Sequence, residues 1–126
     1  MGEKLKYEEI TEKIIGASFD VHNFLGNGFQ EVIYQRALAW EMSQRGLNFG
    51  REIEQQIFYR SLPQPIGTRR ADFVVEGKVL VEIKARINLE DVHVAQILNY
   101  LKAYRMEVGL LINFGSKSLT FKRLVL

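Results

Sequence analysis

The sequence predicts an α/β (mixed α+β) fold in which a central mixed sheet is flanked by helices. Apolar residues recur at helical spacing in three segments, and the segments between and after them have the apolar patterns of strands. The expected order is α-α-β-β-β-α-β, with one further strand at the C-terminus. A sheet covered by helices is the economical way to bury these apolar faces. At 126 residues there is room for one core, so we expect a single domain over residues 1–126.

The first two expected elements are helices. The first covers residues 7–24, and its apolar positions are spaced by three and four: Tyr7, Ile10, Ile14, Ala17, Val21 and Phe24. Gly26-Asn27-Gly28 then favours a turn. The second helix is expected from about residue 29 to residue 45, before Gly46. Its apolar stripe is broad: Ile33, Tyr34, Ala37, Leu38 and Met42.

Three strands are expected next. In residues 52–59 the side chains of Ile53, Ile57 and Tyr59 share one parity, which is typical of a half-buried strand. Residues 61–68 contain both prolines and predict an irregular loop. Residues 70–75 and 79–85 are strand-like, and the short connection between them predicts an antiparallel hairpin.

The last elements are a helix and one or two strands. Residues 90–104 form the expected helix, whose buried stripe is Val94, Ile97, Leu101 and Tyr104. Residues 108–112 are almost continuously apolar, as in a strand covered on both faces. Residues 119–125 are expected to form an edge strand.

Composition excludes several kinds of chemistry. There is no cysteine, so disulfides, thiol nucleophiles, iron–sulfur clusters and cysteine-ligated zinc are ruled out. With only two histidines, a metal site would depend on carboxylates, which favour Mg²⁺ or Mn²⁺. The net charge of +2 does not by itself indicate a nucleic-acid partner. No apolar run is long enough to cross a membrane, so we expect a cytoplasmic protein.

Four charged residues are candidates for a metal site. Glu82 and Lys84 are two apart in a strand and therefore project to the same face. If Glu76-Gly77-Lys78 is the whole connection, Asp72 lies opposite Glu82, and the two carboxylates repel each other unless a cation lies between them. Glu31 heads the stripe formed by Tyr34, Leu38 and Met42, where an ionised side chain is costly to bury. It is equally consistent with a first-turn carboxylate that stabilises the helix N-terminus.

The third helix and the neighbouring basic residues supply further candidates. His93, Gln96 and Tyr100 share a polar face, from which Gln96 and Tyr100 would reach a phosphate or orient metal ligands; an ordinary solvated face is the other interpretation. We expect His93 to be a surface residue. Arg70, close to Asp72, is available to a phosphate backbone, although solvated surface is its usual role.

These residues fall in motifs that resemble the GxxExxY protein family, a prokaryotic group of the PD-(D/E)xK nuclease superfamily. The motifs are Gly28-Phe29-Gln30-Glu31-Val32-Ile33-Tyr34, Arg70-Ala71-Asp72-Phe73-Val74-Val75, Val81-Glu82-Ile83-Lys84-Ala85, Ala95-Gln96-Ile97-Leu98-Asn99-Tyr100-Leu101-Lys102, Asn113-Phe114-Gly115 and Phe121-Lys122-Arg123-Leu124-Val125-Leu126. Together they cover nearly the whole chain from Ile10. Ala71 stands where the superfamily name has proline.

The resemblance implies a restriction-endonuclease-like core and a role for each matching residue. Asp72, Glu82 and the carbonyl of Ile83 would bind Mg²⁺ or Mn²⁺, with Glu31 as a direct or water-mediated ligand. Lys84 would orient the attacking water or stabilise the transition state. Tyr34, Arg70, Gln96 and Tyr100 would bind nucleic acid or support the site.

The implied activity is hydrolysis of phosphodiester bonds in DNA, with RNA as the less favoured alternative substrate. A homodimer is a further expectation, because double-strand cutting by so small a domain would use two copies. The alternative is a catalytically silent module that retains the fold and binds nucleic acid or protein. The small size of the chain favours this alternative, because little surface remains to grip a substrate.

Overall fold

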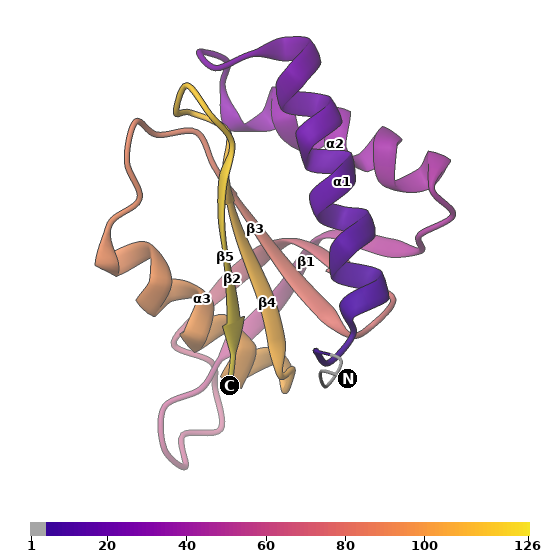
Figure 1. The fold of residues 1–126 in the computed structure, drawn as a ribbon. Helices are drawn as coiled ribbons and strands as arrows, with labels where there is room; N and C mark the ends of the chain where they lie inside the picture. The colour runs from indigo at the N-terminus through magenta and orange to yellow at the C-terminus, as the bar shows by residue number, and fades with distance from the viewer. Residues whose placement is uncertain (1–4) are drawn as a thin grey trace.

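The computed structural model describes residues 5–126, which form three helices and a five-stranded sheet (Figure 1). The elements follow the order expected from the sequence. Their bounds are α1 Glu8–Leu25, α2 Glu31–Gln44, β1 Phe49–Ile57, β2 Gly67–Val75, β3 Val79–Lys84, α3 Asp91–Tyr104, β4 Val108–Asn113 and β5 Thr120–Val125.

The sheet is mixed and its strands lie in the order β1-β2-β3-β4-β5. The β3–β4 pair is parallel and the other neighbours are antiparallel. Parallel neighbours require a crossover connection, and α3 provides it between β3 and β4. The turn between β2 and β3 sets Val75 opposite Val79 and Phe73 opposite Val81, which is the register expected from the connection Glu76-Gly77-Lys78.

Each face of the sheet carries its own apolar core, since α1 and α2 cover one face and α3 covers the other (Figure 1). The β4 strand contributes to both: Leu110 and Ile112 pack with α1 and α2, whereas Leu111 packs with α3. Every residue of β4 is buried, which confirms the prediction of a strand covered on both faces.

Tyr34 fixes the start of α2 from within the core. Its ring is fully buried and stacks on Phe114 with 4.8 Å between centroids. Its hydroxyl donates to the Gly26 carbonyl at 2.6 Å and accepts from the Phe29 N–H at 3.2 Å. Gly28 in this turn has φ +108°, which suits glycine. Because Tyr34 is fully buried, it cannot contact nucleic acid. Of its two expected roles, binding and support, the second fits its contacts at the N-terminus of α2.

Three apolar side chains are more exposed than the sequence pattern suggested. Phe24 is 90% exposed, because Leu25, four residues after Val21, continues the buried face of α1 instead. Ile33 lies at the edge of the α2 stripe and is also exposed. Ile53 is 41% exposed, because β1 is an edge strand that runs over residues 49–57, earlier than expected, and leaves Tyr59 outside it.

Within residues 5–126, none of the helices has both the length and the apolar character that a membrane crossing requires.

Candidate metal centre

Two carboxylates lie side by side where the pairing of β2 with β3 ends. Backbone pairing covers residues 73–75 and 79–81, and at the next position side chains replace it. The Asp72 N–H donates to Glu82 Oε1 at 3.1 Å, and the Ile83 N–H donates to Asp72 Oδ2 at 2.7 Å. Each carboxylate is thus held by the backbone of the other strand. This reciprocal arrangement fixes the direction of both side chains.

Gln35 on α2 holds the second oxygen of Asp72. Its side-chain amide donates to Asp72 Oδ1 at 2.8 Å, and the residue is buried. The sequence interpretation overlooked Gln35. The available signal was its position four residues after Glu31, which places both side chains on one face of α2.

Burial and mutual repulsion oppose ionisation of the pair. Burial raises the pKa of Asp72, and the hydrogen bonds from Ile83 and Gln35 offset this in part. Burial and the charge of Asp72 raise the pKa of Glu82 to about 8. Of the two, Glu82 is therefore the one that retains a proton near neutral pH when no cation is bound.

Lys84 supplies positive charge to both carboxylates. It is the last residue of β3 and is partly buried. Its ammonium group lowers the pKa of Asp72 and that of Glu82, although burial outweighs it at both positions. Lys84 therefore lies within electrostatic reach of the pair, on the strand that carries Glu82.

Glu31 does not have the environment suggested by its apolar stripe. Tyr34, Leu38 and Met42 are fully buried, but Glu31 is exposed as the first residue of α2. The interpretation of Glu31 as a carboxylate buried at a cost was therefore wrong, because the side chain is exposed. Its position matches the other interpretation, a first-turn carboxylate that stabilises the helix N-terminus. Its charge still reaches the centre, because it contributes to the raised pKa of Glu82.

The polar face of α3 divides into three different environments. Tyr100 is partly buried, and its pKa is raised by burial and by the charge of Glu82. Gln96 is exposed. His93 is buried, which corrects the expectation of a surface residue: its Nδ1 accepts from the Glu90 N–H at 2.9 Å in a capping box at the start of α3.

Arg70 is directed to the neighbouring strand. It is exposed and lies 3.7 Å from the Glu54 carboxylate on β1. An exposed pair of this kind contributes little stability and leaves the guanidinium accessible.

The donor set suits a hard divalent cation. Among residues 5–126, no three His, Asp or Glu side chains are grouped so that they could hold a metal ion. Two carboxylates remain, with the backbone carbonyl of Ile83 between Glu82 and Lys84. Oxygen donors of this kind, completed by water, are what Mg²⁺ and Mn²⁺ prefer.

Comparison with known proteins agrees with this fold. A solved structure described as "Crystal structure of SSO0001" matches with a TM-score of 0.60 and 18% sequence identity, over 94% of this chain. The chain spans 59% of that longer protein, and at this identity the likeness concerns the fold alone. No curated protein matches.

A family model supplies the stronger comparison. The model described as "PD-(D/E)XK nuclease superfamily" matches residues 8–124. This range contains every element from α1 to β4, nearly all of β5, and the Asp72–Glu82 pair. The mixed sheet with helices on both faces is also the restriction-endonuclease-like architecture. The chain belongs to the PD-(D/E)XK nuclease superfamily.

Proposed function

We propose that this protein is a metal-dependent nuclease that hydrolyses phosphodiester bonds of DNA. The observation that carries the proposal is the Asp72–Glu82 pair, two neighbouring carboxylates whose pKa values are raised by burial. With both carboxylates ionised and no cation bound, this arrangement is electrostatically unfavourable. A divalent cation between the two would compensate for it, which is a reason for the pair to be there.

In this proposal the ligands of Mg²⁺ or Mn²⁺ are Asp72, Glu82 and the Ile83 carbonyl. The bound cation would lower the pKa of a water molecule and stabilise charge on the phosphate. Lys84 would orient that water and offset charge that develops in the transition state. Gln35 would hold Asp72 in its ligating orientation, and exposed Glu31 would act through a water molecule.

The motif Gly28-Phe29-Gln30-Glu31-Val32-Ile33-Tyr34 supports assignment to the GxxExxY group within the superfamily. A cytoplasmic location would suit a DNA substrate. Cleavage of both strands of a duplex would use two copies of the chain. Light scattering with and without duplex DNA would measure the molar mass and thus show whether the protein is a dimer.

Cleavage assays would test the proposed activity. The purified protein is incubated with Mg²⁺ or Mn²⁺ and with labelled single- and double-stranded DNA and RNA, beside the Lys84→Ala variant. We expect metal-dependent cleavage of DNA by the unaltered protein and loss of that cleavage in the variant. No cleavage beyond that of Lys84→Ala would contradict the proposal and favour a silent binding module.

Gln35→Leu is expected to weaken metal binding. Leucine has a side chain of similar size to that of glutamine, but it cannot donate the hydrogen bond that Asp72 Oδ1 accepts from Gln35. Loss of a residue that orients a metal ligand typically costs about 10- to 100-fold in affinity. Isothermal titration with Mn²⁺ measures the change.

The control for this prediction is Gln44→Leu, at the exposed last residue of α2. It should leave the Mn²⁺ affinity unchanged. Equal affinities for the Gln35→Leu variant and the unaltered protein would show that Gln35 does not position Asp72.

A further inference from the structure

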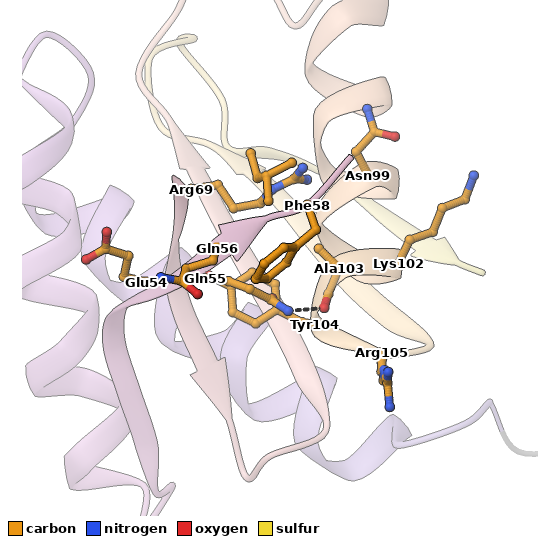
Figure 2. Close-up of a pocket in the computed structure, with 11 residues that line it drawn as sticks. Glu54, Gln55, Gln56, Phe58, Arg69, Asn99, Lys102, Ala103, Tyr104 and Arg105 are labelled. Atoms are coloured by element: carbon orange, nitrogen blue, oxygen red, sulfur yellow. Dashed lines mark hydrogen bonds between the residues drawn. The ribbon is translucent and has the colours of Figure 1, made fainter. Parts of the chain in front are cut away.

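A groove lies between β1 and the C-terminal half of α3 (Figure 2). Its volume is about 970 Å³. One wall comes from β1 and the residue after it, the other from the end of α3, and the Gln55 side chain joins them by donating to the Ala103 carbonyl. We call it the β1–α3 groove and describe it by six of its residues: Gln55, Phe58, Arg69, Asn99, Lys102 and Arg105.

Positive charge predominates in the β1–α3 groove. Arg69, Lys102 and Arg105 line it, and the one acidic residue among its lining residues, Glu54, lies beside Arg70. Arg69 Nε is buried and has no hydrogen-bond partner in the described structure. In residues 5–126, neither Lys102 nor Arg105 pairs with a carboxylate. These cations are therefore available to an anionic ligand.

An exposed aromatic ring lies among these cations. Phe58 lines the groove directly after β1 (Figure 2). Its side chain is 54% exposed. The loop that follows also carries the exposed apolar side chains of Tyr59, Leu62 and Ile66. Exposed aromatic rings beside basic side chains are the combination with which proteins bind unpaired bases and their phosphates.

The β1–α3 groove borders the metal centre through β2 and α3. The Arg69 guanidinium lies 5.1 Å from the centroid of the Tyr100 ring, and Tyr100 is within electrostatic reach of Glu82. The Tyr104 hydroxyl, in the groove lining, accepts from the N–H of Ala71 at 3.1 Å, next to Asp72. Arg69 and Tyr104 thus connect the groove to β2, the strand that carries Asp72.

We propose that the β1–α3 groove binds a single strand of nucleic acid that extends from the metal centre, with one base stacked on Phe58. Arg69, Lys102 and Arg105 contact its phosphates. An unpaired strand fits this surface better than a duplex, because the bases of a duplex already stack on one another and offer no face to Phe58. The inference rests on the proposed nuclease function for the origin of the strand, but its binding step is measured without cleavage.

Fluorescence anisotropy in EDTA tests the stacking contact. A labelled single strand is compared with a duplex of the same length, for the unaltered protein and for Phe58→Ala. Base stacking on an aromatic side chain contributes about 1–3 kcal/mol, so we expect roughly 5- to 150-fold weaker binding of the single strand by Phe58→Ala. Phe24→Ala, an exposed phenylalanine outside the groove, is the matched control and should bind normally.

The salt dependence of binding tests the role of the basic side chains. Removal of one cation that neutralises a phosphate should reduce the slope of log affinity against log salt by about 0.7 for a single strand. We expect this for Lys102→Ala but not for Lys122→Ala, an exposed lysine on β5. If Lys102 only compensates the dipole of α3, its removal lowers the melting temperature and leaves binding unchanged, which would overturn the proposal.

The outcomes also separate this proposal from the nuclease itself. One outcome is that cleavage is lost in Lys84→Ala, whereas Phe58→Ala retains both cleavage and single-strand affinity. This result would contradict strand binding in the β1–α3 groove and support the nuclease activity. If the protein binds a single strand through the groove but does not cleave it, the result would support the binding proposal and contradict the nuclease activity. Equal loss of duplex and single-strand affinity in Phe58→Ala would contradict stacking on an unpaired base.

Discussion

Glu82→Gln is expected to make the protein more stable at pH 9 and to abolish its binding of Mg²⁺. Burial and the Asp72 carboxylate raise the pKa of Glu82 to about 8 in the folded protein. Above that pH the folded state must hold an unfavourable buried charge. Glutamine removes the charge, and its carbonyl oxygen can still accept the hydrogen bond from the Asp72 N–H.

The direction of the pH dependence follows from proton linkage. Below the ordinary pKa of a glutamate, Glu82 is protonated in both the folded and the unfolded states. Between that value and about 8 the folded state retains the proton and the unfolded state releases it. The free energy of unfolding therefore falls as the pH rises, by at most about 1.4 kcal/mol per pH unit, and levels off above the folded pKa. The raised pKa of Asp72 adds to the same slope.

Urea unfolding at pH 5, 7 and 9 measures this effect. We expect Glu82→Gln to gain on the order of 3 kcal/mol over the unaltered protein at pH 9 and little at low pH. Glu12→Gln, at an exposed position of α1, is the control and should follow the unaltered protein. Isothermal titration at pH 9 should show no Mg²⁺ binding by Glu82→Gln. Lower stability of this variant at pH 9, or unchanged Mg²⁺ affinity, would contradict the assigned environment of Glu82.

The proximity of Asp72 and Glu82 could be predicted because it depends on local geometry. A short connection between two antiparallel strands sets their register, and the register determines which side chains meet. The same holds for β4, whose continuous apolar run requires cover on both faces. In both cases the decisive information lies within a few residues of sequence.

Gln35 and Glu31 could not be placed in this way. Their environments depend on how α2 lies across the sheet. An apolar stripe shows which face of a helix is turned toward the sheet, but not which turns of the helix the sheet covers. Glu31, at the first turn, therefore lies in solvent, whereas Gln35, one turn later, reaches Asp72. His93 was misplaced for a different reason: its ring satisfies the backbone of Glu90, and histidine is an unusual partner in a capping box.

The β1–α3 groove could not be predicted from the sequence. Its two walls are joined by Gln55 and Ala103, which belong to elements that β2 and β3 separate along the chain. No periodicity or motif relates these positions. Only the packing of α3 across the face of the sheet brings Lys102 and Arg105 into the same groove as Phe58.

Gly115→Ala is expected to cause the largest loss of stability among glycine-to-alanine changes within residues 5–126. An added Cβ at Gly115 would lie 2.1 Å from the Arg86 nitrogen and 2.3 Å from the Ala85 carbonyl carbon. These are backbone atoms, so the overlap cannot be relieved by a side-chain rotation. The free energy of unfolding should fall by roughly 2–4 kcal/mol, the upper range for overpacking.

The hydrogen bonds of Asn113 explain why the two segments cannot simply separate. Its Oδ1 accepts from the Arg86 N–H at 3.0 Å and from the Gly115 N–H at 3.1 Å, and its Nδ2 donates to the Arg86 carbonyl at 2.8 Å. Asn113 is buried, so donors left unpaired by a displacement would be costly. The displaced segment directly follows Lys84, and we therefore expect any metal-dependent cleavage to decrease together with stability.

Gly16→Ala provides the opposite result from the same chemical change. Gly16 lies within α1, and an added Cβ there meets no atom within 4 Å. Alanine in a helix interior is favoured over glycine by about 1 kcal/mol, so this variant should be more stable than the unaltered protein. Urea unfolding of both variants measures what the close approach of residue 115 to residues 85 and 86 costs when a methyl group is added. If Gly115→Ala were as stable as Gly16→Ala, that approach, and with it the fixed position of the segment after Lys84, would have to be abandoned.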